Sequence, residues 1–290
     1  MKRCIIKTRT NLSKAELEAC HSLNAACREV DGTYRQPYLS NMLNFDKDMP
    51  AFLLAYQDER LLGLLAIYAD DREELAEVSL MVRPDVRGKG IASQLLNQFY
   101  LIQEEHKLLG PLFVTEQVFL QQNPNFLENM ELVAEEEKEI WLSRERKAFK
   151  EVYLPDMECL LATADDIEAI AQFQSQTFET SLEMSIQYAK EAVYDKNSLL
   201  YIIKKGEKIF ASCTVDLSTS YNYLYGLAVT EDMRGKGIGS ALVKSVINDL
   251  IDRNTRKFQI AVEEENVGAW SLYKNLGFTE QTQIVYMRKK

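Results

Sequence analysis

The stretch that decides the fold occurs twice in this chain. Residues 229–243 read VTEDMRGKGIGSALV, and residues 82–96 read VRPDVRGKGIASQLL. Nine of the fifteen positions match, including an unbroken RGKGI, and the equivalent Arg87 and Arg234 stand 147 residues apart. A segment that recurs at half the length of a 290-residue chain indicates a duplicated domain.

Each copy follows a predicted strand and opens a predicted amphipathic helix. Its glycines let successive backbone N–H groups point at one spot, and the helix adds its own unpaired N–H groups and positive dipole end. Together these groups form an anion cradle suited to a pyrophosphate, with Arg87 or Arg234 at its rim. One such turn alone is equally well explained as a tight glycine turn, but two copies in the same context favour the anion site.

Two familiar phosphate loops do not fit this turn. A Walker A loop requires G-x-x-x-x-G-K-[ST], which neither copy contains. A dinucleotide fingerprint requires a third glycine where Ser93 and Ser240 stand, and it belongs to the first strand of a βαβ unit.

The remaining periodicity predicts similar elements in both halves. Strands are expected at 4–8, 51–57, 62–68, 77–82, 112–116 and 138–143, and again at 159–162, 199–204, 209–216, 223–229, 258–262 and 283–288. Helices are expected at 13–30, 91–106 and near 126, and again at 165–176, 238–252 and 267–276. The charged stretch 144–151 (RERKAFKE) is the predicted linker, which gives domains at 1–147 and 148–290.

Composition limits the class of protein. Apolar residues make up 46% of the chain and charged residues 27%, as in folded globular proteins. A net charge of −10 argues against a nucleic-acid partner and favours a neutral or cationic one. Five cysteines without a C-x-x-C pair and two isolated histidines predict neither a metal site nor a disulfide framework. The longest apolar run, 61–69, is too short to span a membrane, so we expect a cytoplasmic protein.

The R-x-x-G-x-[GA] turn between the fourth strand and the following helix resembles motif A of the GCN5-related N-acetyltransferases (GNAT). The predicted element order, strand–helix–helix–hairpin–strand–helix–strand–helix–strand, is similar to that family in each half. The resemblance implies an α/β (α+β) fold of two tandem domains, each a mixed, mostly antiparallel sheet flanked by helices. It also implies acetyl-CoA as co-substrate and no metal.

The resemblance also implies which residues hold acetyl-CoA, with the pyrophosphate on the glycine turn and the pantetheine along the fourth strand. In the second half these are Leu227, Ala228, Val229, Arg234, Gly235, Lys236, Gly237, Ile238, Gly239 and Asn266. In the first half they are Leu80, Val82, Arg87, Gly88, Lys89, Gly90, Ile91 and Ala92.

The second half carries a further block, N-x-x-A-x-x-x-Y-x-x-x-G-F, from Asn266 to Phe278, which is typical of the same family. By position alone Asn266 is a helix N-cap and Tyr273 a packed core tyrosine. The resemblance instead makes Tyr273 the general acid that protonates the leaving thiolate, with an oxyanion donor on the backbone near Leu227 or Ala228. Glu263 is the candidate that accepts or relays the amine proton, and a solvated strand end is its alternative.

Three tyrosines and an aspartate near this block stay open. Tyr221, Tyr223 and Tyr225 alternate onto one face of the fourth strand, either as sheet packing or as a wall of the acceptor groove. Asp216 is equally open.

The first half departs from the family where the acid should stand. Its corresponding segment is FLENMEL, and the tyrosine position falls on Phe126 or Leu127. Glu77 and Glu116 are the polar groups that remain there. The first domain is therefore expected to be non-catalytic, either a CoA-binding or a structural partner.

The sequence thus favours an N-acetyltransferase acting on a primary amine of a small molecule, or of a peptide, with its chemistry in the second half. The acidic balance favours a cationic acceptor, such as a polyamine or an aminoglycoside-like amine. The alternatives are a non-catalytic acyl-CoA-binding or scaffolding protein and, with less support, a transferase that uses aminoacyl-tRNA. No nucleic-acid or membrane partner is expected, and the chain should be a monomer with an internal pseudo-dimer or a homodimer.

Overall fold

The computed structural model describes residues 4–290 and divides them into two compact units. The first unit ends at Glu139 and also contains Thr282–Lys290, whereas the second comprises Ile140–Gln281. The units therefore differ from the predicted domains 1–147 and 148–290, because the last nine residues belong to the first unit.

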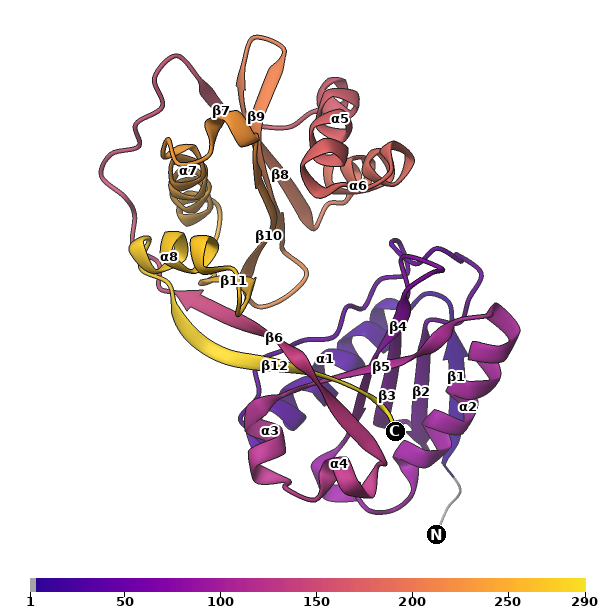
Figure 1. The fold of residues 1–290 in the computed structure, drawn as a ribbon. Coiled ribbons are helices and arrows are strands. Elements are labelled where there is room, and N and C mark those ends of the chain that lie inside the picture. Colours follow the sequence, from indigo (N-terminus) through magenta and orange to yellow (C-terminus); the bar gives the residue numbers. More distant parts are fainter. Residues whose placement is uncertain (1–3) are drawn as a thin grey trace. The chain divides into compact units, whose positions relative to one another are not determined.

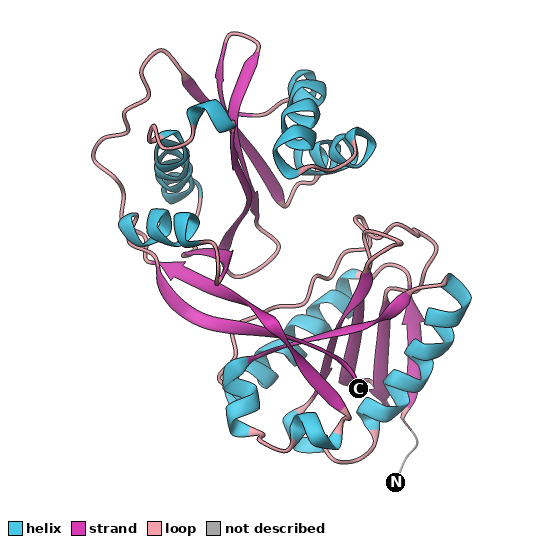
Figure 2. Cartoon of the chain, in the orientation of Figure 1, coloured by secondary structure: helices cyan, strands magenta, loops and turns pink. Residues whose placement is uncertain are grey.

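The first unit is a sheet in the order β1-β2-β3-β4-β5-β12-β6 (Figures 1 and 2). Strand β4 pairs with β5 in parallel, whereas the pairs β1–β2, β2–β3, β3–β4 and β12–β5 are antiparallel. Its strands are β1 (Ile5–Arg9), β2 (Phe52–Gln57), β3 (Arg60–Tyr68), β4 (Leu75–Val82), β5 (Leu109–Glu116), the start of β6 (Leu132–Arg144) and the end of β12 (Thr279–Lys289).

Two long helices cover the sheet of the first unit. They are α1 (Lys14–Asp31) and α2 (Ile91–His106), and the short α3 (Gln117–Gln122) and α4 (Phe126–Asn129) follow β5. The capping box predicted at Ser13 and Glu16 is present at the start of α1. The core joins both long helices to β2 and β3, with Leu23, Leu95 and Phe99 fully buried.

The first unit lacks the second helix that the resemblance implies between its first two strands. Residues 32–51 carry no helix, and Pro37 and Pro50 disfavour one. The segment is held by side chains instead: Asn44 Oδ1 accepts from the Ala69 N–H at 2.7 Å, and Glu116 binds the backbone at Tyr34 and Arg35.

The second unit has strand order β6-β11-β10-β9-β8-β7, with β12 beginning beside β6. Its further strands are β7 (Glu158–Leu161), β8 (Ser198–Lys205), β9 (Lys208–Asp216), β10 (Asn222–Val229) and β11 (Phe258–Glu263). Its helices are α5 (Ile167–Phe178), α6 (Leu182–Tyr194), α7 (Ile238–Arg253) and α8 (Val267–Asn275).

The helices of the second unit lie on two faces of its sheet (Figure 1). One apolar cluster joins α7 and α8 to the strands through residues such as Leu242, Ile260 and Tyr273. A second, smaller cluster joins α5 and α6 to β8 and β9. The resemblance implies a second helix before the hairpin, and α6 is that helix, although the periodicity predicts no residue range for it.

The predicted linker at 144–151 is partly built into the second unit. Arg144 is buried and donates through Nε to the Leu276 carbonyl at 2.7 Å, and its guanidinium stacks on Phe149. Phe149 in turn exchanges two backbone hydrogen bonds with the Asn248 side chain on α7. A charged sequence is therefore not always a solvated one, since an arginine can satisfy several buried carbonyls at once.

Candidate active site

The two glycine turns have nearly the same backbone. Gly88 and Gly90 have φ of 73° and 77°, and Gly235 and Gly237 have φ of 73° and 83°. This left-handed region favours glycine over residues with a side chain. The repeated RGKGI therefore encodes one conformation twice.

Each turn ends at the N-terminus of a 16-residue helix that has no side-chain cap. Gly90 is the N-cap of α2 and Gly237 the N-cap of α7. No atom of the described chain lies within 4 Å of where a Cβ would stand on any of the four turn glycines. Uncapped N–H groups facing open space fit a bound pyrophosphate, so the residues present suit the phosphate end of CoA.

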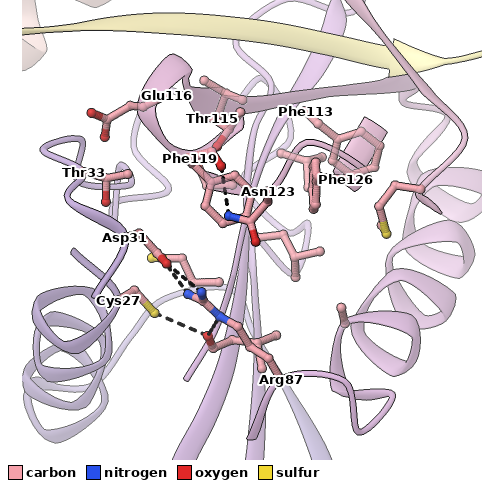
Figure 3. A pocket seen from close by; sticks show the side chains of 18 of the residues that line it. Cys27, Asp31, Thr33, Arg87, Phe113, Thr115, Glu116, Phe119, Asn123 and Phe126 are labelled. Carbon is pink, nitrogen blue, oxygen red and sulfur yellow. Dashed lines mark hydrogen bonds and ion pairs between the residues drawn. The ribbon is translucent and has the colours of Figure 1, made fainter. Parts of the chain in front are cut away.

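The arginines beside the two turns differ in their partners. Both use Nε to bind the last carbonyl of the preceding strand, Arg87 at Val82 (3.0 Å) and Arg234 at Val229 (3.2 Å). Arg87 also forms two 2.6 Å hydrogen bonds to the Asp31 carboxylate (Figure 3). Within residues 4–290, Arg234 is bonded to no carboxylate. The second turn therefore keeps a guanidinium that can meet a phosphate, whereas the first has neutralised its own.

In both units the two parallel strands stop pairing before they reach their C-terminal ends, which lie on the side of the glycine turn. The pairing of β4 with β5 ends at Val78–Phe113, although the strands run on to Val82 and Glu116. The pairing of β10 with β11 ends at Leu224–Ile260. Separated strands leave backbone groups that an extended ligand can bind as an added strand.

A β-bulge distinguishes β10 from β4. Opposite β9, the register passes from Tyr225–Thr214 to Ala228–Ser212, so Gly226 and Leu227 face the single residue Cys213. Gly226 adopts φ of 59°. In the first unit, β3 and β4 pair without a break from Gly63–Val82 to Tyr68–Glu77. Of the two fourth strands, only β10 therefore has backbone N–H groups displaced from the regular pairing. They lie at the predicted oxyanion donor.

Tyr273 lies on α8 in the apolar core, with 5% of its surface exposed, and its ring contacts Phe278. Burial raises its pKa, and Cys213 contributes to that shift. Tyr273 belongs to the same apolar cluster as Cys213, which stands across from the bulge. Its hydroxyl forms no hydrogen bond within the described residues, so it is a protonated and uncommitted donor at neutral pH.

Asn266 has the capping role that its position suggests. Its side chain accepts from the Ala269 N–H at 3.0 Å at the start of α8. Glu263 ends β11 and is exposed. Phe258, Ile260 and Val262 point into the core, so Glu263 lies on the opposite face of that strand, together with Gln259. The assignment of Asn266 to CoA binding and of Glu263 to proton transfer stays a prediction.

The first unit contains a cavity of about 600 Å³ between its separated strands. It extends from the turn residues Gly88 and Gly90 to Glu116, and Phe113, Phe119 and Phe126 supply aromatic walls (Figure 3). Asn123 also lines it and donates to the Phe119 carbonyl at 2.9 Å. The cavity has the shape of a cofactor slot but bears no hydroxyl at the Phe126 position.

The two carboxylates predicted to remain in the first unit are engaged in structural bonds. Glu77 is ion-paired with Arg35, which also donates to Ser79 Oγ at 2.7 Å. Glu116 is 2% exposed and accepts from the N–H groups of Tyr34 and Arg35 at 2.7 Å and from Thr282 Oγ1 at 2.6 Å. Both carboxylates are therefore engaged by partners within the first unit.

Asp31 and Arg35 are not among the predicted site residues. In the structure they form ion pairs with Arg87 and Glu77, two charged groups of the first unit's site. Asp31 is the last residue of α1, where a negative charge opposes the helix dipole. An acidic residue at that position is destabilising unless a cation pairs with it, so the position itself predicts a positively charged partner. Arg35 gave no such signal, because it stands in a segment without periodicity.

No group of three or more His, Cys, Asp or Glu side chains that could hold a metal ion occurs in residues 4–290. In the same part of the chain, no helix combines the length and the apolar character needed to cross a bilayer.

Comparison with known proteins agrees with this geometry. The model of the acetyltransferase (GNAT) family matches residues 17–106 and 164–278, which is well over half of the chain. The chain therefore belongs to the acetyltransferase (GNAT) family, and each of its two units carries one match.

Curated relatives match only short segments. The thialysine N-epsilon-acetyltransferase of Sus scrofa is 38% identical over 61 residues, which cover 21% of this chain and 36% of the relative. The ribosomal protein bS18-alanine N-acetyltransferase of Escherichia coli (strain K12) is 36% identical over 59 residues, covering 20% and 40%. The matches span well under half of either relative.

Solved structures match the whole chain. A GCN5-related N-acetyltransferase from Sphaerobacter thermophilus superposes with a TM-score of 0.72 at 18% identity, covering 100% of this chain and 96% of that one. A tandem GNAT protein from the clavulanic acid biosynthesis pathway gives a TM-score of 0.70 at 14% identity and covers 98% of each chain. These likenesses establish the tandem fold.

Proposed function

We propose that the second unit transfers an acetyl group from acetyl-CoA to a primary amine of a small molecule, with a peptide amine as the second choice of acceptor. The observation that carries this assignment is the bulge at Gly226 and Leu227, which the first unit lacks. A backbone N–H freed from the ladder beside separated strands is a preorganised donor for a developing oxyanion.

The residues around the bulge supply the remaining functions. Acetyl-CoA brings the activated thioester, held at Arg234, Gly235, Lys236, Gly237, Ile238 and Gly239 and along Leu227, Ala228 and Val229. The amine nitrogen forms a bond to the thioester carbon, and the C–S bond breaks. Tyr273 donates its proton to the departing sulfur and is reprotonated by the proton that the nitrogen loses.

The amine must first lose its ammonium proton, since an ammonium has no lone pair for attack. Glu263 is the candidate base. It is the last residue of β11, the strand that pairs in parallel with β10, and it lies on the face of β11 that points away from the core. We propose that it accepts this proton directly or through water.

We propose that the first unit is a non-catalytic partner. Its unbroken β4, the phenylalanine at position 126 and the ion pair of Glu77 with Arg35 support this assignment. Its cavity and its glycine turn leave CoA binding there as a separate property.

The test is thiol release from acetyl-CoA in the presence of a panel of primary amines and of peptides with free N-termini. We expect at least one small amine to accelerate thiol release by wild-type protein, with one acetamide formed per thiol by mass spectrometry. If no amine in either class does so while calorimetry shows CoA bound, the chain is an acyl-CoA-binding protein and not a transferase.

A further inference from the structure

Three aromatic rings form a row on one face of the second unit's sheet. Trp141 on β6 stacks on Tyr223 of β10 with ring centroids 5.3 Å apart and an interplanar angle of 30°. Tyr223 stacks on Tyr225 with centroids 6.1 Å apart and an angle of 16°. Stacked rings turn their faces toward one another, so Tyr225, at the end of the series, has one face outside the stack.

This row does not belong to the packing under α7. Ile140, Leu142 and Leu224 point into that core, so Trp141, Tyr223 and Tyr225, which alternate with them, face the other way. Within the described residues, none of the three rings is a member of the cluster under α5 and α6 either. Tyr225 keeps 39% of its surface exposed. The rings are therefore poorly explained by core packing.

Carboxylates lie beside the aromatic row. Asp216 is the direct cross-strand partner of Tyr223, and cross-strand partners share a face. Both Asp216 and Glu191 act electrostatically on the Tyr225 hydroxyl, and Asp195 acts on Asp216. The cation that opposes them is Arg256, whose guanidinium is bonded to the Leu217 carbonyl. Three of these charged groups are carboxylates and one is a guanidinium, and burial is the main cause that raises the pKa of Asp216.

The row leads along β10 toward the bulge. Tyr223 and Leu227 are four residues apart on one strand, a distance of roughly 13 Å at about 3.3 Å per residue. Glu263 lies on the same face, on the neighbouring strand β11. An elongated acceptor could therefore place one nitrogen at the bulge and a second positive group between the rings and Asp216.

We propose that this aromatic row and Asp216 form the acceptor site, and that the acceptor is a small aliphatic di- or polyamine. The proposal rests on the proposed function for the identity of the reaction, but not for the binding of the cation. An ammonium over a tyrosine or tryptophan face is attracted by the ring quadrupole, and a neighbouring carboxylate adds a charge-assisted hydrogen bond. A monoamine would lack the second positive group.

The test is calorimetric titration of the full chain, with CoA present, using 1,6-diaminohexane and hexylamine as matched probes. These differ only in the second ammonium. We expect the diamine to bind with a Kd about tenfold lower than that of the monoamine. Asp216→Asn should bring the two Kd values to within about twofold, whereas Glu264→Gln, an exposed acidic control outside the row, should leave the ratio unchanged.

Tyr225 gives a second, independent variant. We expect Tyr225→Ala to weaken both probes about fivefold and Tyr225→Phe to keep both affinities, because the ring face and not the hydroxyl makes the contact. This comparison remains informative if Asp216→Asn does not fold, since Asp216 also accepts from the Ser218 N–H at 2.6 Å.

Three results would overturn the proposal: equal affinity of the wild type for the two probes, a diamine preference that persists in Asp216→Asn, or unchanged affinity of Tyr225→Ala for both probes. Binding and reaction are read separately. A diamine that binds as expected but releases no thiol from acetyl-CoA would refute the transferase and leave the cation site standing.

Discussion

Tyr273 is buried, but its hydroxyl forms no hydrogen bond within the described residues. Removing the hydroxyl therefore tests its chemical role without removing a structural bond. We expect Tyr273→Phe to lower kcat for acetyl transfer about 100-fold, because a positioned general acid contributes at least that much. The melting temperature should change little, since no hydrogen bond is lost. Thiol release and a thermal melt measure the two effects.

Tyr201 is the matched control for that substitution. It is also a buried tyrosine of the second unit, but its hydroxyl is bonded to Asp249. Tyr201→Phe should lower stability by about 1–2 kcal/mol and leave kcat within about twofold. If Tyr273→Phe behaves as Tyr201→Phe does, Tyr273 is a packing residue and the acid lies elsewhere.

Asp46 gives a prediction for pH. Its carboxylate lies 2.7 Å from His106 Nδ1, and this hydrogen bond is the main cause that lowers the pKa of Asp46 below its ordinary value. A lowered folded-state pKa stabilises the ionised form, so the contribution is complete at neutral pH and is lost as pH falls through the folded-state pKa.

Asp46→Asn should therefore lower the melting temperature at pH 7, and the difference from wild type should shrink as pH falls below about 4. Chemical or thermal unfolding across this range measures the difference. A gap that is unchanged between pH 7 and pH 3 would show that the carboxylate charge is not involved.

At the residue scale, the sequence predicted what depends on neighbours in the chain. The turn glycines and the Ser13–Glu16 capping box follow from local conformation, and both are confirmed. The pair of Arg87 with Asp31 joins residues 56 apart, and no local rule specifies such a partner. The polar character of a site is therefore harder to predict than its backbone.

Among the elements, the two turn-helix pairs offer the sharpest comparison. Gly90 and Gly237 are both N-caps with positive φ, so replacement by aspartate strains the two backbones alike. A carboxylate in either cradle repels pyrophosphate. We expect Gly237→Asp to weaken CoA binding at least tenfold and Gly90→Asp to have a smaller effect, because only the second turn keeps an unpaired arginine.

Calorimetric titration of CoA into each variant decides the matter. Affinity lost only with Gly90→Asp would move the working cofactor site to the first unit. In that event the cavity between β4 and β5, and not the bulge of β10, would define the active half.

Element prediction succeeded where one face is strongly apolar. The helix predicted at 91–106 is α2, and the hairpin predicted around residues 58–60 is β2–β3. It gave no residue range for α6, where the resemblance implies a helix, and the resemblance misled for residues 32–51, which contain two prolines. The family's element order therefore holds for the second helix in one unit and not in the other.

At the scale of the whole molecule, the largest effect comes from β12. This strand follows the second unit in the chain, but its last residues complete the sheet of the first unit. Val285 and Met287 are each 2% exposed and lie in the core of the first unit, where β12 pairs with β5. Removing residues 282–290 should cost that unit at least roughly 3–6 kcal/mol, because the buried side chains of Val285 and Met287 are lost from its core along with a strand. The second unit should keep its stability.

Hydrogen exchange resolved by residue measures this effect. Amides in residues 4–139 should lose protection in the truncated chain, and those in 145–275 should not. Removal of residues 289–290 alone, which are exposed, is the control. Unchanged protection in the first unit would show that β12 does not contribute to its stability.

The contribution of β12 to the first unit also sets an order of events during protein synthesis. A ribosome makes the first unit's other strands long before residues 282–290 emerge, so β5 waits with an open edge while the whole second unit is translated. We expect the nascent first unit to remain a client of chaperones until residues 282–290 emerge. A stop codon before residue 282 would then damage the half of the protein that was made first.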